Sequence, residues 1–289
     1  MKRILLQLDT EEHPSPFDAI VAHDADVDVL LSHGNVKRED ARALAQDAFF
    51  TRGPDDLKNT AIWVGGKHVA AGEEIFAEVQ KAFFGPFKVS VMLDSNGCNT
   101  TAATTIARIA KSYDLDGRRA VVLGLGSVGL RSAVLLQKEG CEVVVAPLPA
   151  DLFDDDRPYR RPRGLDAAEN LGLEPREPKD RSELEATLEG AHVVLAAGPA
   201  GVEVLRQDFW SKHPSIELLA DYNAADPLGL EGTKATDELV DYTGKLVLGA
   251  LAIGGPKMKV HKTCIRRMFE SNDKVFDIDT VYEVAKELV

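Results

Sequence analysis

Two periodicities alternate along residues 1–100. Four short apolar runs predict strands: RILLQLD, DVDVLLSHG, NTAIWVGG and FKVSVMLDSNG. The intervening segments KREDARALAQDAFF and AAGEEIFAEVQKAFFG place apolar residues at helical spacing, and Gly85-Pro86 ends the second one. This order predicts a βαβα arrangement, the pattern of an α/β domain.

The pattern restarts at Arg118 with five β-branched runs that suit strands covered on both faces: RRAVVLGLG, EGCEVVVAPL, GAHVVLAAG, SIELLADYN and KLVLGALAIGG. Before them, CNTTAATTIARIAKSYDLDG predicts a helix capped by Asn99 or Thr100 and ending near Tyr113. We therefore expect an α/β protein of two domains, an N-terminal α/β domain over residues 1–115 and a doubly wound Rossmann-type domain over 116–255. The C-terminal helices, residues 256–289, are expected to pack back on the first domain.

Composition narrows the class of protein. The net charge of −13, from 47 acidic against 34 basic residues, disfavours a nucleic-acid or anionic-membrane surface. The three cysteines have no CxxC spacing and the seven histidines show no metal-ligand pattern, so no metal site is expected. The first apolar run turns polar at Gln7 and no later run approaches membrane-spanning length, so we expect a cytoplasmic protein without a signal peptide.

The stretch VVLGLGSVGLRSAVLLQKEG contains GxGxxG between a predicted strand and a predicted helix. In a dinucleotide site, Gly124 would allow the tight turn, Gly126 the close approach of a pyrophosphate, and Gly129 the packing of helix on strand. The alternative is a tight turn without a ligand.

The residue that selects between NAD and NADP is expected about 20 residues after the glycine loop. That stretch, residues 145–149, offers neither an acid nor a base. The following loop offers aspartates and then Arg157, Arg160, Arg161 and Arg163, which are either a phosphate clamp or a solvated loop.

Ligands of a doubly wound sheet lie at the carboxyl ends of its strands. We expect those ends at Gly198 and Gly201, at residues 221–223 and at residues 249–255, and in the first domain at Asp94 to Thr101. These amide, hydroxyl and carboxylate groups suit a flat heterocycle, although a capped strand–helix turn would also explain the last set. Acid–base motifs are otherwise scarce, which is compatible with hydride transfer.

Several long stretches resemble the NADP-dependent methylene-tetrahydromethanopterin dehydrogenases of methylotrophic bacteria, a family that includes forms acting on methylene-tetrahydrofolate. The resemblance covers nearly the whole chain. It is carried by LDTEEHPSPFDAIV, FFGPFKVSVMLDSNGCNTTAA, AVVLGLGSVGLRSAVLL, IELLADYNAADPLG and LGALAIGGPKMKVHKTCI.

The resemblance implies hydride transfer from the methylene bridge of a reduced pterin to nicotinamide, as in formaldehyde oxidation. It places the pterin on the first domain and the dinucleotide on the second. Lys257 would orient the substrate and supply an electric field, unless it is an exposed lysine at a helix start. The implied pterin-binding residues are Asp18, Asp94, Asn96, Asn99 and Thr101, with a local turn cap as the alternative for Asp18. The implied cofactor-binding residues are Gly124, Gly126, Ser127, Val128, Gly129, Arg160, Arg161, Gly198 and Asn223.

One departure from the family concerns the cofactor. NADP-preferring members carry Gly-Arg-Lys after the second strand of the dinucleotide domain, where this chain has Pro147, Leu148 and Pro149. We expect NADP, with NAD also possible. The resemblance further implies a homo-oligomer, a trimer or a multiple of it. Two alternatives stay open: tetrahydrofolate as the carrier, and a non-catalytic NADP-binding redox sensor.

Overall fold

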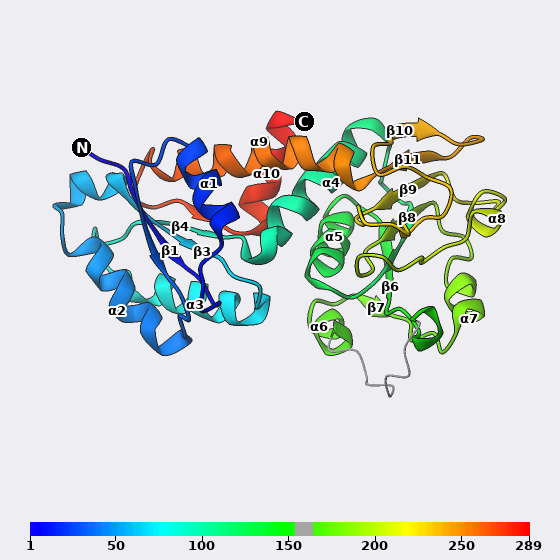
Figure 1. Cartoon of the computed structure of the whole chain (residues 1–289), viewed down its shortest axis with the longest axis horizontal. Coiled ribbons are helices and arrows are strands. Elements are labelled where there is room, and N and C mark those ends of the chain that lie inside the picture. Colours follow the sequence, from blue (N-terminus) through cyan, green and yellow to red (C-terminus); the bar gives the residue numbers. More distant parts are fainter. Residues whose placement is uncertain (154–163) are drawn as a thin grey trace. The chain divides into compact units, whose positions relative to one another are not determined.

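The computed structural model describes residues 1–153 and 164–289, and the chain forms two compact units (Figure 1). The first unit comprises Met1–Thr100 and Lys257–Val289, and the second comprises Thr101–Pro256. No helix in the described part of the chain has both the length and the apolar character needed to cross a membrane.

Two helices carry the chain between the units. The chain enters the second unit within α4 (Cys98–Ser112) and returns to the first within α9 (Ala250–Met268). The second unit is therefore an insertion between two segments of the first.

The first unit is built on a five-stranded, entirely parallel sheet in the order β12-β4-β3-β1-β2. Its strands are β1 (Ile4–Leu8), β2 (Val29–His33), β3 (Thr60–Val64), β4 (Ser90–Leu93) and β12 (Val275–Phe276). The four strands expected in residues 1–100 are confirmed. The strand β12 was not expected, because two residues are too few to show a periodicity.

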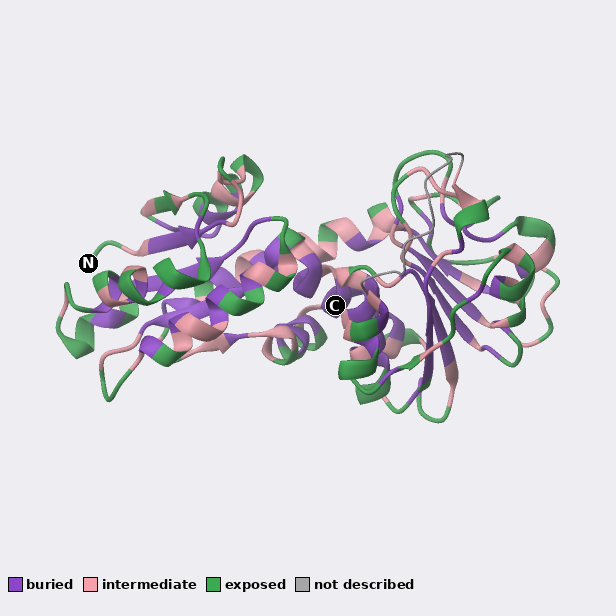
Figure 2. Cartoon of the chain, turned by 90° about the horizontal axis from the view of Figure 1, so that it is seen from below, coloured by how far each residue is buried: buried purple, intermediate pink, exposed green. Residues whose placement is uncertain are grey.

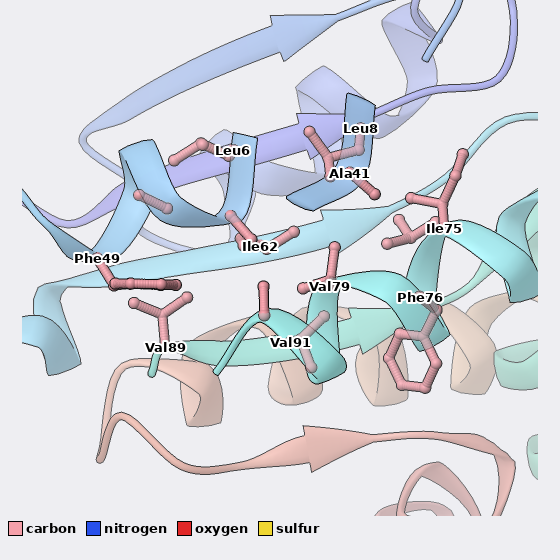
Figure 3. Packing of buried hydrophobic residues seen from close by; sticks show 14 of the residues in the cluster. Leu6, Leu8, Ala41, Phe49, Ile62, Ile75, Phe76, Val79, Val89 and Val91 are labelled. Carbon is pink, nitrogen blue, oxygen red and sulfur yellow. The ribbon is translucent and has the colours of Figure 1, made fainter. Parts of the chain in front are cut away.

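One face of this sheet forms an apolar core with two helices. The helices of the unit, besides parts of α4 and α9, are α1 (Pro16–Asp24), α2 (Arg38–Phe49), α3 (Val69–Ala82) and α10 (Ile278–Leu288), with short 3₁₀ turns η1 (Pro54–Asn59) and η2 (Ser95–Gly97). In Figure 3, Leu6 and Ile62 of the strands meet Ala41 of α2 and Ile75 and Val79 of α3. Each of the large side chains contributes about 1.5–3 kcal/mol when fully buried.

The second unit contains a seven-stranded sheet in the order β10-β11-β9-β8-β5-β6-β7. Its strands are β5 (Arg119–Leu123), β6 (Glu142–Ala146), β7 (Glu174–Pro175), β8 (Val193–Ala196), β9 (Leu218–Asp221), β10 (Glu238–Asp241) and β11 (Leu246–Leu248). From β5 the chain builds outward to β6 and β7, and then continues on the other side with β8 and β9. This reversal is the topological switch point of a doubly wound fold, as predicted. The edge strand β10 is antiparallel, which was not predicted.

The strands β5, β6, β8, β9 and β11 of the second sheet are largely buried, and the short edge strands β7 and β10 are more exposed. The helices of this unit expose their outer faces (Figure 2). These helices are α5 (Ser127–Lys138), α6 (Gly164–Asn170), α7 (Arg181–Ala186) and α8 (Gln207–Trp210), with a 3₁₀ turn η3 (Ala150–Leu152). The long apolar runs of the sequence therefore correspond to strands covered on both faces.

Two local expectations were wrong. Helix α4 begins at Cys98, so Asn99 and Thr100 lie inside it and neither is its cap. The last parallel strand ends at Leu248 and α9 begins at Ala250, so residues 250–255 are helical and do not form a strand end. Lys257 consequently lies in the body of α9, one residue after Pro256.

Candidate functional site

The glycine loop of the second unit has the backbone that its sequence requires. Gly124 follows β5 with φ of 111°, and a Cβ there would lie 2.3 Å from the carbonyl oxygen of Ala197. A Cβ on Gly129 would lie 2.1 Å from the carbonyl oxygen of Gly124. A Cβ on Gly126, by contrast, would meet nothing within 4 Å. The first and third glycines are therefore needed for packing, and the second faces open space.

A cavity of about 700 Å³ lies over this loop, at the carboxyl ends of the strands beside the switch point. Its described lining contains no charged residue. The lining residues are Gly124, Leu125, Gly126, Ser127, Val128, Gly129, Pro147, Leu148, Phe153, Gly164, Ala197, Gly198, Pro199 and Tyr222. Because α5 begins at Ser127, the backbone N–H groups of its first turn have no acceptor within the helix and can serve an anion.

Tyr222 and Asn223 follow β9 and have different surroundings. The Tyr222 hydroxyl lies 2.7 Å from the Ser132 Oγ atom, and burial raises its pKa to about 12, so the phenol stays neutral at physiological pH. The sequence analysis missed Tyr222 as a cavity residue. The Asn223 side chain is buried, donates to the Pro227 carbonyl at 2.9 Å and accepts from the Ala225 N–H at 2.8 Å. Asn223 therefore stabilises the turn and does not line this cavity.

The expected cofactor clamp lies outside the described residues, since residues 154–163 include both Arg160 and Arg161. Pro147 and Leu148, where an acid or base was sought, line the cavity with apolar groups.

The first unit holds a second cavity, of about 630 Å³, with a strongly charged lining. It is lined by Asp9, Glu11, Glu12, His13, Ser15, Pro16, Phe17, Asp18, Gly66, Lys67, Asn96, Gly97 and Lys257. Three of the expected pterin-side residues, Asp18, Asn96 and Lys257, thus come together at one cavity.

Asp18 and Lys257 are close enough to influence each other. Burial, followed by the charges of Asp94 and Asp9, raises the pKa of Asp18 to about 7, and Lys257 lowers it in part. The Lys257 Nζ atom lies 5.2 Å from the centre of the Phe17 ring, within the range of a cation–π contact. A Cβ on Gly97 would lie 3.1 Å from that Nζ atom, so this glycine makes room for the lysine.

Asp9 is a functional candidate that the sequence analysis missed. It is buried directly after β1 and accepts hydrogen bonds from the N–H groups of Glu11, at 2.8 Å, and Ser15, at 3.0 Å. Ser15 in turn caps α1 by accepting from the Asp18 N–H at 3.3 Å. Asp9 therefore fixes the loop that carries much of the charged lining. Its position after a strand is the signal by which sequence reasoning could have found it.

Three other expected residues do not line the charged cavity. Asn99 is buried and its side-chain amide donates to the Leu93 carbonyl at 2.7 Å. Asp94 is also buried and accepts from the Thr100 N–H at 3.0 Å and the Thr100 hydroxyl at 2.7 Å. Thr101 is the first residue of the second unit, and its carbonyl accepts from the Thr105 hydroxyl at 2.9 Å.

Asp94 and Thr100 flank a turn in an unusual conformation. Asn96 and Gly97 have φ of 54° and 62°, both in the left-handed region. The Gly97 N–H donates to the Asp94 carbonyl at 3.0 Å, and the Asn96 N–H donates to the Gly66 carbonyl at 2.7 Å. These bonds hold the two turn residues at the cavity wall.

A doubly wound sheet with a glycine loop at its switch point, joined to a second α/β unit with a polar cavity, defines the class of dinucleotide-binding α/β proteins. Residues 16–96 match the family model described as "Methylene-tetrahydromethanopterin dehydrogenase, N-terminal". Two proteins of Methylorubrum extorquens are similar over 99% of this chain and 99% of their own length. One is named "Bifunctional protein MdtA" and is 43% identical, and the other is named "NAD(P)-dependent methylenetetrahydromethanopterin dehydrogenase" and is 31% identical. The chain belongs to the methylene-tetrahydromethanopterin dehydrogenase family.

Solved structures offer more distant likenesses. A transhydrogenase from Sinorhizobium meliloti is similar over 92% of this chain and 91% of its own, with 11% identity and a TM-score of 0.47.

Proposed function

We propose that this protein is an NAD(P)-dependent oxidoreductase that oxidises methylene-tetrahydromethanopterin. A hydride passes from the methylene carbon to C4 of the nicotinamide, so the pterin becomes a methenyl cation and NAD(P)⁺ becomes NAD(P)H, in a reversible reaction. The observation that carries the proposal is the 43% and 31% identity over 99% of the chain, because it extends over both cavities.

The second unit supplies the groups for the dinucleotide. Gly126 leaves open space at the start of α5, where the N–H groups of Ser127 and its neighbours can bind a pyrophosphate. When bound, the nicotinamide would supply the two-electron acceptor. The relative named as NAD(P)-dependent supports NADP as a cofactor, with NAD as a possible second one. The described lining holds no carboxylate that would repel the 2′-phosphate of NADP.

The first unit supplies the groups for the pterin. Asp18, with a pKa of about 7, exists partly protonated at neutral pH and can therefore accept or donate a hydrogen bond at the edge of a heterocycle. Lys257, on α9, orients the substrate from a different helix than Asp18, which lies on α1. Four carboxylates and two lysines line the cavity, and this acidic balance favours a transition state in which the pterin gains positive charge.

Two further properties belong to the same proposal. The family resemblance supports a homo-oligomer, a trimer or a multiple of it. Cys98, Cys141 and Cys264 are buried and carry thiols, not disulfides, which is typical of proteins from a reducing compartment and supports the cytoplasm as the location.

A steady-state assay tests the proposal directly. Methylene-tetrahydromethanopterin and methylene-tetrahydrofolate are each combined with NADP⁺ and with NAD⁺, and the absorbance of the reduced nicotinamide is followed. We expect turnover with the tetrahydromethanopterin substrate, faster than with tetrahydrofolate. Faster turnover of methylene-tetrahydrofolate would identify tetrahydrofolate as the carrier. Dinucleotide binding without any turnover would favour the redox sensor.

A further inference from the structure

A buried histidine behind the charged cavity has no role in the function described so far. His261 lies on α9, four residues after Lys257, with only 1% of its side chain exposed. Within the described part of the chain, neither ring nitrogen has a hydrogen-bond partner. Burial lowers its pKa to about 4, so the ring is neutral at physiological pH.

The ring is held between a strand and a strand end. It packs edge-on against Trp63 of β3, with ring centres 4.9 Å apart and planes at 85°. Its Nδ1 atom lies 3.6 Å from the Asp94 Oδ2 atom at the end of β4. Because a neutral imidazole carries one proton, the tautomer with hydrogen on Nδ1 directs a donor at this carboxylate.

Asp94 connects the histidine to the cavity wall. Its two oxygens accept from the N–H and hydroxyl of Thr100, and its carbonyl accepts from the Gly97 N–H. Asn96, in the left-handed region, forms the wall between these anchors. Such a conformation persists only where its surroundings hold it, and the hydrogen bonds that Asp94 accepts from Thr100 and Gly97 are part of that support.

Helix α9 therefore contacts the turn at two points. Residues four apart in a helix lie on the same face, and here Lys257 reaches Gly97 while His261 reaches Asp94. The first contact lies at the cavity, and the second lies in the buried layer behind it.

We propose that His261 is a positioning residue for the pterin: its Nδ1–H braces Asp94 and, through Asp94, keeps the 94–97 turn in the conformation that the substrate meets. It does not touch the substrate itself. The inference rests on the proposed function, since it takes the charged cavity as the pterin site. The 3.6 Å separation is longer than a hydrogen bond, so the proposal requires this contact to shorten when the pterin fills the cavity.

Two substitutions of His261 distinguish a hydrogen-bonding role of its Nδ1–H group from a role in packing alone. His261→Asn keeps an N–H close to the position of Nδ1, whereas His261→Leu fills similar space without a donor. We expect His261→Leu to raise the KM for the pterin about tenfold, with a smaller change in kcat, because small displacements in a binding site weaken substrate contacts. His261→Asn should restore most of the wild-type KM, and the dinucleotide Kd should not change in either variant.

A second variant approaches the same carboxylate from its other side. Thr100→Val removes the hydroxyl that donates to Asp94 and leaves α9 intact. It should raise the pterin KM in the same way, and it keeps the inference testable if His261→Leu does not fold. A thermal melt of each variant checks that it is folded before its KM is compared with that of the wild type.

Calorimetry with the methenyl compound measures pterin binding to the dinucleotide-free protein. This measurement distinguishes a failure of the proposed function from a failure of the role given to His261. A wild-type protein that binds no pterin overturns the proposed function and the inference with it. A wild-type protein that binds the pterin, with equal affinity for the Asn and Leu variants, overturns the inference alone.

Discussion

The two cavities both lie at the carboxyl ends of parallel strands, but the residues that line them differ in chemistry. The cavity of the second unit is lined by glycines, backbone and apolar groups, and its specific feature is the absence of side chains at Gly124, Gly126 and Gly129. The cavity of the first unit is lined by carboxylates and lysines. The first kind of site fails when a side chain is added, and the second when a charge is removed or titrated.

The largest effect should follow from adding a methyl group to the glycine loop. Gly129→Ala places a Cβ 2.1 Å from the Gly124 carbonyl, so the loop must move. We expect dinucleotide affinity to fall by roughly 100-fold, equivalent to one or two charge-assisted hydrogen bonds, and stability to fall by about 1–3 kcal/mol from overpacking. Fluorescence titration with NADPH and urea unfolding provide the two measurements.

Gly126→Ala is the matched control for that variant. Its Cβ meets nothing within 4 Å in the protein, so stability should be almost unchanged while dinucleotide affinity still falls. Equal affinity of Gly126→Ala and wild type would show that the open space at Gly126 does not receive the phosphates.

Removing a charge should damage the other cavity and leave the glycine loop intact. Lys257→Ala is expected to lower kcat/KM for the pterin by about 10–100-fold, the value of a hydrogen bond to a charged group, with an unchanged Kd for NADPH. Lys259→Ala, on an exposed position of the same helix, is the control and should behave as wild type. A loss of NADPH affinity in Lys257→Ala would contradict the division of labour between the units.

The next expected effect is a pH dependence of stability that comes from Asp18 in the charged cavity. The pKa of Asp18 is about 7 in the folded protein against 3.8 for an isolated carboxyl, so the folded state binds the extra proton. The stabilisation from this proton is complete below pH 3.8 and is lost as the pH rises through about 7. Relative to Asp18→Asn, the wild-type free energy of unfolding should fall by about 4 kcal/mol over this window, because each tenfold difference in proton affinity is worth about 1.4 kcal/mol. Urea unfolding at intervals from pH 4 to 8 measures it, and parallel curves for the two proteins would refute the assignment.

The smallest effect is expected when the neutral hydroxyl of Tyr222 is removed. Tyr222→Phe removes the hydrogen bonds of this hydroxyl with Ser132 and Thr105, and the Ser132 hydroxyl still donates to the Val128 carbonyl at 2.8 Å. Stability should fall by about 1 kcal/mol and the dinucleotide Kd should rise only a few-fold. A change above tenfold would indicate that Tyr222 contacts the cofactor directly.

Much of the fold could be predicted because its strands are buried and bounded by clear turn signals. The central strands of both sheets and the glycine loop follow from local patterns alone. The strands β7, β10 and β12 escaped prediction, because β7 and β12 are each two residues long and β10 pairs irregularly at an exposed edge.

Side-chain direction was harder to predict than position. Asn99 stands in a polar stretch after a strand, which indicates a ligand contact, yet its amide turns back to the Leu93 carbonyl. His261 looks like an isolated surface histidine in KVHKTC, and its burial arises only when α9 packs beside β3, whose residues are distant in the sequence. The roles of Asp18, Asn96 and Lys257 toward a pterin stay predictions.

The insertion of the second unit within the first has a consequence for biosynthesis. A ribosome completes residues 101–256 before it makes the segment 257–289, which supplies β12, Lys257 and His261 to the first unit. Since domains generally fold as units during synthesis, the nascent second unit can fold while the first still lacks an edge strand and a wall of its cavity. Competence for substrate would then be acquired only after residues 257–289 have left the exit tunnel.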